Sequence, residues 1–345
     1  MFTAMHHQDV QELHFCHKEQ LNAVIAIHNL RLGPALGGCR FLPYSTEQEA
    51  ITDALRLAKG MSYKAALARV PQGGGKAVIM APKGHFNRKA LFKQFGRFIH
   101  SLSGRYITAM DSGSQVSDMD DIRSQTPYVS SSSDIGDPSP TTAQGVALGI
   151  STAVQFQFSQ DLSDIRVAIQ GLGHVGLALA EQLYLQGAQL IVSDVDSKKA
   201  QLAGQKFNAK VVAPEDIYKQ ECEVFSPCGL GAILNEKNIN ALQCNIIAGC
   251  ANNQLASDEM GQVLHDKGIL YAPDYVINSG GLIFASSRFR GLKASEITHE
   301  VNKLKDTLDK IFVLSNTKNK ACHEIANEMA EQILFSKVTP LQEAV

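Results

Sequence analysis

The sequence predicts an α/β protein with two domains, and three observations support this fold class. Its 345 residues exceed the length at which a single hydrophobic core usually stops growing. Short apolar segments typical of strands alternate with amphipathic segments typical of helices along most of the chain. Residues 130–142, SSSSDIGDPSPTT, form the most turn-rich and least apolar segment. We therefore place one domain at residues 1–137 and expect the other to begin at residue 138.

The first domain is predicted to begin with a strand at residues 22–28, NAVIAIH, followed by a turn-rich segment at residues 32–41. A helix comes next, because Ser45 and Gln48 form a capping box ahead of an apolar stripe. Gly60 is placed to end this helix as a C-terminal cap.

The same domain continues with a short buried strand at residues 77–80 and a helix that runs from a cap at Asn87 to Leu102. A further strand is predicted at residues 105–109, RYITA. The next helix is expected to carry three acids near its start: Asp118, Asp120 and Asp121. Stabilisation of the helix dipole by first-turn acids explains them better than a metal cluster does.

Two lysines stand out at residues 60–76, GMSYKAALARVPQGGGK. Lys76 directly follows three glycines, whose permissive backbone is expected to form a turn that lets the lysine approach a ligand closely. An ammonium group in an enclosed site loses hydration and releases its proton more readily. Lys64 could then hold a substrate carboxylate. The alternative is a surface turn with two solvated lysines.

Asp111 follows the strand at residues 105–109 and precedes small, flexible residues. A carboxylate in this position is suited to face a cleft, although the cap of an ordinary turn has the same pattern. Asp111 is therefore a candidate for proton transfer.

The second domain carries a nucleotide-binding signature. The strand at residues 166–170, RVAIQ, leads into Gly171, Gly173 and Gly176, and an amphipathic helix then runs to Gly187. The glycines allow a tight turn, close approach of a pyrophosphate and close packing of the helix on the strand. The start of the helix supplies amide donors.

Asp194 ends the next strand, where its carboxylate would bind the adenosine ribose and repel a 2′-phosphate, which favours NAD over NADP. His174 is expected to start the helix rather than to act as a catalyst. Asn252 and Asn278 follow later strand-like segments and could reach a cofactor or substrate. Two terminal helices, at residues 297–311 and 325–333, are expected to serve core or subunit packing.

Composition excludes several classes of function. A formal charge of −2 provides no basic surface for nucleic acid or an anionic membrane. No apolar run approaches a spanning helix, and the polar N-terminus has no signal-peptide pattern, so we expect a cytoplasmic protein. The seven scattered cysteines are expected to be reduced thiols, and no metal site is expected.

Nine segments, in order, resemble the signatures of the amino acid dehydrogenase family, which includes the glutamate, leucine, valine, phenylalanine and tryptophan enzymes. They are GPALGGCR, GMSYKAAL, GGGKAVI, RYITAMDSGS, GDPSPTTAQGV, GLGHVG, SPCGLGAIL, AGCANNQL and APDYVINSGGLI. The leucine and tryptophan members look nearest. The resemblance implies an N-terminal substrate and dimerisation domain (1–137), a Rossmann-like NAD domain (138–318), and a C-terminal helix (319–345) that returns to the first domain. It also implies a homo-oligomer, either a dimer or an octamer.

By the same resemblance, the protein converts an L-amino acid to a 2-oxo acid and ammonia with NAD. Lys64 matches the lysine that binds the substrate α-carboxylate, Lys76 the catalytic lysine, and Asp111 the acid that exchanges protons with the substrate nitrogen. Further substrate-binding positions carried over are Leu36, Gly37, Ala109, Asn278, Leu282 and Ala285. The cofactor-binding positions are Thr142, Gly171, Gly173, His174, Val175, Gly176, Asp194, Cys228 and Asn252.

Leu36 stands where glutamate-specific members have a lysine, so glutamate is expected to be a poor substrate and a leucine-like amino acid a good one. An aromatic substrate, tryptophan or phenylalanine, is the alternative, and a regulator that binds NAD without turnover is a weaker one. A 2-hydroxy acid dehydrogenase is disfavoured because no histidine is suitably placed. Four residues depart from the family pattern around the pocket: Met110, Ser112, Gln115 and Phe284.

Overall fold

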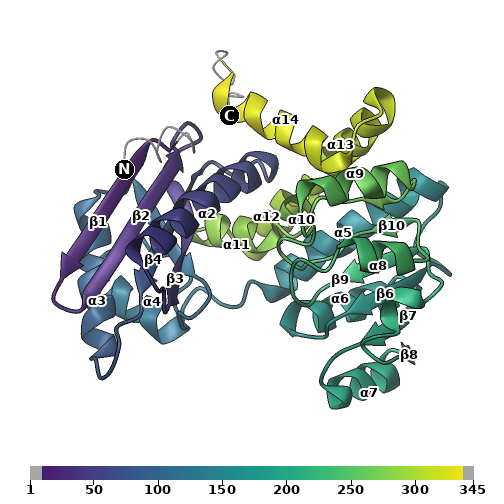
Figure 1. The fold of residues 1–345 in the computed structure, drawn as a ribbon, viewed down its shortest axis with the longest axis horizontal. Coiled ribbons are helices and arrows are strands. Elements are labelled where there is room, and N and C mark those ends of the chain that lie inside the picture. The colour runs from purple at the N-terminus through teal and green to yellow at the C-terminus, as the bar shows by residue number, and fades with distance from the viewer. Residues whose placement is uncertain (1–9, 337–345) are drawn as a thin grey trace. The chain divides into compact units, whose positions relative to one another are not determined.

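The computed structural model describes residues 10–336, which form two compact units, each built on its own β-sheet (Figure 1). Unit 1 takes its described residues from the segment that ends at Asp137, from Ala285–Lys293 and from Ala330 onward. Unit 2 comprises Pro138–Phe284 and Ala294–Met329. Of the predicted C-terminal segment 319–345, the structure describes residues 319–336.

Unit 1 contains a five-stranded sheet in the order β1-β2-β4-β3-β5. Strands β1 and β4 are antiparallel to β2, whereas β3 is parallel to both β4 and β5. The elements are β1 (Glu12–Lys18), β2 (Leu21–Asn29), β3 (Ala35–Leu42), α2 (Glu47–Leu67), β4 (Gly73–Met80), α3 (Arg88–Ser101), β5 (Tyr106–Met110) and α4 (Val116–Arg123).

Alternating side chains on the central strands fill two separate cores. Val24 and Ala26 of β2 pack with α2 on one face of the sheet. Ile25 and Ile27 pack with α3 and α4 on the other face. Both faces are covered, which explains why β2 is apolar along nearly its whole length.

Two predictions about the lysine stretch are wrong. Gly60 does not end the helix, because α2 continues through it to Leu67 and the position of its missing side chain faces open space. The glycines at 73–75 lie inside β4 rather than in a turn. They are needed for close packing: a Cβ on Gly74 would overlap the backbone nitrogen of Ser62 on α2. Lys64 therefore projects from a helix and Lys76 from a strand.

Other boundaries also differ from the sequence prediction. Residues 35–42 form β3 rather than a turn, and β1 was not predicted because its residues are mostly polar. The cap of α2 is Thr46, whose side chain accepts a hydrogen bond from the Glu49 amide at 3.2 Å, one residue after the predicted Ser45. The cap of α3 at Asn87 is confirmed, with a bond of 3.0 Å from the Ala90 amide.

Unit 2 contains a six-stranded, wholly parallel sheet in the order β11-β10-β9-β6-β7-β8. Its strands are β6 (Arg166–Gln170), β7 (Gln189–Ser193), β8 (Lys210–Val211), β9 (Val224–Pro227), β10 (Ile246–Ile247) and β11 (Leu270–Tyr271). Its helices are α5 (Ser139–Phe158), α6 (His174–Leu185), α7 (Ser197–Lys206), η1 (Ile217–Lys219), α8 (Glu236–Ala241), α9 (Asp258–Asp266), α10 (Asp274–Ile277), α12 (Ala294–Asn302) and α13 (Leu304–Lys318). This order confirms the predicted Rossmann-like arrangement around the glycine signature.

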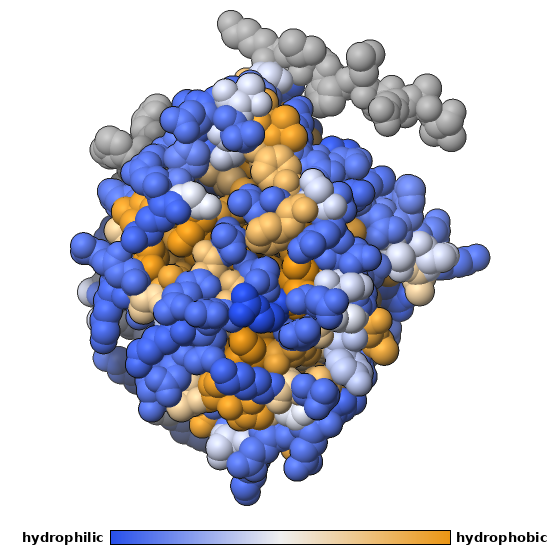
Figure 2. All heavy atoms as spheres, turned by 90° about the vertical axis from the view of Figure 1, so that its right-hand side faces the viewer, coloured by the Kyte–Doolittle hydropathy of each residue, from blue (hydrophilic) through white to orange (hydrophobic). Residues whose placement is uncertain are grey.

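Two helices cross the limits of the units: α11 (Gly280–Phe289) and α14 (Cys322–Phe335). The helix predicted at residues 297–311 is two helices, α12 and α13, which meet at Lys303. The face drawn in Figure 2 is largely hydrophilic with separate hydrophobic patches. Among the large apolar side chains of unit 2, Leu185, Val195 and Leu230 are exposed.

Candidate active site

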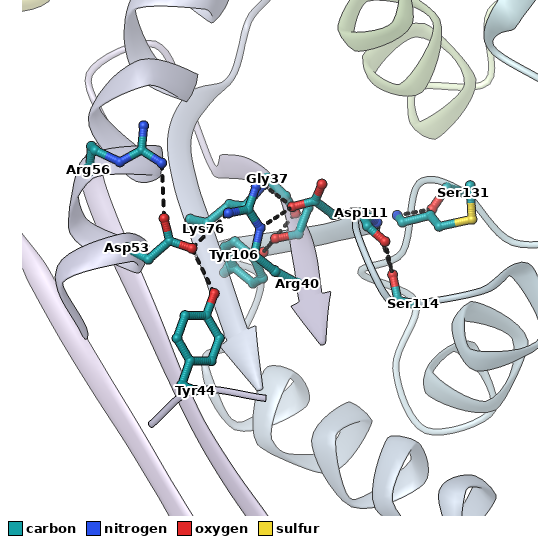
Figure 3. A network of polar contacts seen from close by, with 12 residues as sticks. Gly37, Arg40, Tyr44, Asp53, Arg56, Lys76, Tyr106, Asp111, Ser114 and Ser131 are labelled. Carbon is teal, nitrogen blue, oxygen red and sulfur yellow. Dashed lines mark hydrogen bonds and ion pairs between the residues drawn. The ribbon is translucent and has the colours of Figure 1, made fainter. Parts of the chain in front are cut away.

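The central feature of unit 1 is an ion pair between Lys76 and Asp111 (Figure 3). Lys76 lies on β4 and is only 6 % exposed. Asp111 follows the last residue of β5 in a turn, where Ser114 Oγ accepts a bond of 2.9 Å from the Asp111 amide. Asp111 is therefore both a turn residue and a carboxylate presented to a lysine.

Glycines on β3 shape the space around this pair. A Cβ on Gly38 would lie 2.7 Å from Asp111 Cβ and 3.3 Å from Lys76 Nζ, so only glycine leaves the two charged groups uncovered there. A Cβ on Gly37 would overlap the Gly75 carbonyl oxygen. The Tyr106 hydroxyl donates to the Gly37 carbonyl at 2.7 Å, which holds β3 in place from β5.

A second cation, which was not expected from the sequence, lies next to Asp111. Arg40 Nε lies 3.6 Å from Asp111 Oδ2. The same guanidinium donates through Nη1 to Asp53 Oδ2 at 2.7 Å, and the Tyr44 hydroxyl donates to the same oxygen at 2.7 Å. Arg56 completes this anchor with a bond of 3.0 Å to Asp53 Oδ1. An arginine in the apolar strand ALGGCRFL was the available signal, because such a charge needs a buried partner.

The electrostatics favour an ionised Asp111. Burial acts to raise the pKa of the Asp111 carboxyl, but the Lys76 ammonium and the Arg40 guanidinium outweigh it and hold that pKa below its ordinary value. Burial likewise acts to raise the pKa of Asp53, and the Tyr44 hydroxyl together with Arg40 holds it low. A carboxylate in contact with a buried ammonium can exchange protons with a ligand placed beside both.

The other predicted residues of unit 1 lie on β3, β5, α2 and α11. Leu36 is 1 % exposed on β3, and Ala109 on β5 pairs with Gly38 in the ladder. Lys64 is partly buried in the last turn of α2, the helix that packs against β4. Ala285 is partly buried on α11. Their substrate-binding roles remain predictions.

The glycine signature of unit 2 has the geometry that a pyrophosphate requires. Gly171 has φ +98°, and a Cβ on Gly176 would overlap the Gly171 carbonyl oxygen. A Cβ on Gly173 would meet open space, so the backbone before α6 is accessible to a ligand. The structure confirms that His174 is the first residue of α6, and Val175 follows it. The Leu172 amide donates to Asp194 Oδ2 at 2.6 Å, which fixes that carboxylate beside the signature.

Further predicted residues of unit 2 are connected to this edge of the sheet. The Cys228 amide donates to the carbonyl of Gln170 at 2.7 Å. The Asn278 amide donates to Asn252 Oδ1 at 2.9 Å and to the Cys250 carbonyl at 3.1 Å. These residues gather beyond the carboxyl ends of the parallel strands, where open α/β sheets bind ligands.

Two remaining positions lie near Asn278 in sequence or space. A Cβ on Gly281 would lie 3.0 Å from Thr142 Oγ1, so Thr142 adjoins the start of α11. Leu282 is 7 % exposed on the same helix.

Across residues 10–336, no three histidine, cysteine or acidic side chains gather as metal ligands. No helix in that range is long and apolar enough to cross a membrane.

Comparison with known proteins gives the family. Residues 7–128 match the model of the Glu/Leu/Phe/Val dehydrogenase dimerisation domain, and residues 192–339 match that of Glutamate/Leucine/Phenylalanine/Valine dehydrogenase. The chain is 42 % identical to leucine dehydrogenase of Geobacillus stearothermophilus, a match covering 96 % of this chain and 92 % of that one. It is 43 % identical to L-tryptophan dehydrogenase of Nostoc punctiforme, covering 96 % and 95 %.

Solved structures agree with the sequence relatives. The crystal structure of L-tryptophan dehydrogenase from Nostoc punctiforme superposes with a TM-score of 0.89 at 42 % identity, covering 97 % of this chain and 98 % of that one. Relatives named for leucine and for tryptophan are thus about equally similar, so the comparisons do not separate these substrates. The chain is an amino acid dehydrogenase and belongs to the glutamate/leucine/phenylalanine/valine dehydrogenase family.

Proposed function

We propose that this enzyme catalyses the reversible, NAD-dependent oxidative deamination of an apolar L-amino acid to its 2-oxo acid and ammonia. The observation that carries the proposal is the contact between the buried Lys76 and the ionised Asp111, uncovered by Gly38. An acid and a base in direct contact can serve the two directions of an amine–carbonyl conversion, which needs proton transfer at both nitrogen and oxygen.

The dinucleotide is expected to bind at the glycine signature of unit 2. The accessible backbone at Gly173 and the amides that open α6 fit a pyrophosphate. Asp194, held by the Leu172 amide, would accept hydrogen bonds from the ribose and disfavour a 2′-phosphate. When bound, the nicotinamide supplies a hydride acceptor, which no side chain of the chain can provide.

The residues of unit 1 would bind the substrate and transfer protons. Once Lys76 has given up its own proton, the neutral Nζ would take a proton from the water that adds to the oxidised carbon. Asp111 Oδ2 would pass protons to and from the substrate nitrogen as ammonia leaves. Lys64 would pair with the α-carboxylate and orient the substrate, which reduces the entropic cost of reaching the transition state.

Substrate preference follows from the apolar positions. Leu36 is buried and cannot offset the desolvation of a side-chain carboxylate, so glutamate should react poorly. A leucine-like side chain is favoured, while the similarity to tryptophan dehydrogenase keeps an aromatic side chain as a second candidate. An apolar pocket distinguishes one methylene by only about 1–3 kcal/mol, so the preference must be measured.

The test is NAD reduction against leucine, isoleucine, valine, phenylalanine, tryptophan and glutamate. Lys76→Ala should abolish turnover, whereas Lys89→Ala, which removes an exposed lysine on α3, should leave it unchanged. Glutamate as the best substrate would refute the Leu36 argument but spare the chemistry. No turnover on any of these amino acids, with NAD still bound, would favour a regulator.

The matched dimerisation domain also supports a homo-oligomer. Sedimentation velocity should detect an assembly of two or more copies, and a monomer at micromolar concentration would contradict this.

A further inference from the structure

Two cysteines lie side by side just beyond neighbouring strands of unit 2. In the parallel ladder Ile246 pairs with Val224 and Ile247 with Phe225. The Ala248 amide donates to the Phe225 carbonyl at 3.0 Å, and the same offset would bring the Cys250 amide to the Pro227 carbonyl. The Ala251 amide makes that bond instead, at 2.9 Å, so the two segments remain close but the pairing shifts by one residue, and Cys250 lies within one position of Cys228.

This placement suits a covalent link between the two thiols. Neighbouring strands lie about 4.8 Å apart. Disulfides join residues whose Cα atoms are roughly 4.4–6.8 Å apart. Cys250 Sγ lies 3.9 Å from the Cys228 carbonyl oxygen, so its side chain is directed toward Cys228.

The surroundings distinguish Cys228 from the other cysteines. A hydrogen bond from the Cys250 thiol lowers the pKa of Cys228, with a further contact from Ser226 Oγ at 3.5 Å. Burial instead raises the pKa of the thiols at Cys39, Cys244 and Cys322, and raises that of Cys222 to about 12. Cys228 and Cys250 are both partly exposed, beside the exposed Leu230. The thiolate is the form of a cysteine that oxidants attack.

We propose that Cys228 and Cys250 form a redox modification site that takes a hydroperoxide as its oxidant. The Cys228 thiolate attacks the O–O bond of hydrogen peroxide, gives a sulfenic acid, and releases water after protonation. The Cys250 thiol then attacks that sulfur, the S–S bond forms, and a second water leaves. Two thiols lose two electrons, and one peroxide is reduced to two waters.

The consequence for ligand binding rests on the proposed function. Cys228 adjoins the glycine signature through Gln170, and Asn278 joins the Cys250 carbonyl to Asn252. Drawing Cys228 and Cys250 together would displace both loops that are predicted to contact NAD. The disulfide should therefore weaken dinucleotide binding, and a thiol reductant should restore it.

The site is tested by exposing the full-length protein to hydrogen peroxide and mapping linked peptides by mass spectrometry without reduction. A Cys228–Cys250 peptide pair, lighter by two hydrogens, is expected in the wild type and in Cys244→Ser. In Cys250→Ser the pair should vanish and Cys228 should be trapped by dimedone as the sulfenic acid. Absence of the pair in the wild type, or random oxidation of all seven cysteines, would overturn the site.

Its effect is measured separately by titrating NADH fluorescence on reduced and oxidised protein. The Kd of the wild type should rise about tenfold on oxidation and fall again with dithiothreitol, a change of roughly 1.4 kcal/mol. Peroxide should not raise the Kd of Cys250→Ser in this way. Equal affinities with the disulfide formed would overturn the regulatory effect. Failure of the reduced wild type to bind NADH would refute the proposed cofactor instead, because the peptide map does not depend on NAD.

Discussion

Replacing Arg40 with glutamine should make the enzyme more sensitive to acid. Arg40 Nε lies 3.6 Å from Asp111 Oδ2 and helps to keep that carboxylate ionised. The groups that face Asp111 from the strands around it are Lys76 on β4, Arg40 and Cys39 on β3, and Tyr106 on β5. Removing one of the two cations leaves Asp111 more easily protonated, so the acid limb of the rate profile should move to higher pH.

The size of the effect follows from the distance. Two unit charges 3.6 Å apart interact by about 1 kcal/mol in water and about 5 kcal/mol at an effective dielectric constant of 20. Asp53 neutralises part of the Arg40 charge, and both side chains of the pair are about one-fifth exposed, which favours the lower part of this range. We expect about 1–2 kcal/mol, a factor of roughly 5–30 in the proton-binding constant.

The assay is kcat/KM for the preferred amino acid across the acid limb. Arg56→Gln is the matched control, because Arg56 also binds Asp53 but is 57 % exposed and has no contact with Asp111 in the network of Figure 3. Its acid limb should stay near that of the wild type. An unmoved limb in Arg40→Gln, or one that moves to lower pH, would refute the electrostatic reasoning.

Three further predictions concern the same unit. Gly38→Ala should remove most activity while leaving circular dichroism unchanged, because its Cβ would lie 2.7 Å from Asp111 Cβ; full activity would show that this space is not used. Phe95→Ala should lower the free energy of unfolding by about 3–5 kcal/mol in urea, because the ring is fully buried; a loss below about 1 kcal/mol would contradict its place in the core. Asp53→Asn should reduce the loss of stability at acid pH. Because the pKa of Asp53 in the native protein is below its ordinary value of 3.8, the ionised carboxylate stabilises the fold at pH values above 3.8. This contribution disappears as the pH falls through the native pKa. Urea midpoints that depend on pH identically in both proteins would count against this prediction.

The nucleotide-binding half of the fold was predictable because its signals are local and agree with one another. Gly171, Gly173 and Gly176 follow a strand and open a helix, as predicted, and Asp194 directly follows the next strand, one residue past its last residue, Ser193. Local preference and global fold point to the same structure there.

The structure of residues 60–76 was harder to predict, because the sequence does not show whether a glycine serves a turn or close packing. Gly74 is small because the backbone of α2 occupies its side-chain space, a fact that depends on residues twelve positions away. Arg40 was missed for a related reason. Its role depends on Asp53 of α2 and on Asp111 after β5, two segments that meet Arg40 only in the folded unit.

The division of the chain has a consequence for folding during synthesis. The sheet of unit 1 is built from β1 to β5, but the unit also uses Ala285–Lys293 and residues from Ala330 onward. Two contacts depend on these late segments: Ser286 Oγ donates to Gln72 Oε1 at 2.5 Å, and the Tyr63 hydroxyl donates to Glu331 at 2.8 Å. Domains usually fold in the order in which the ribosome releases them. Here unit 1 can be completed only after residues from Ala330 onward have been made, so its sheet, which is made much earlier, must wait while Tyr63 of α2 lacks its Glu331 partner.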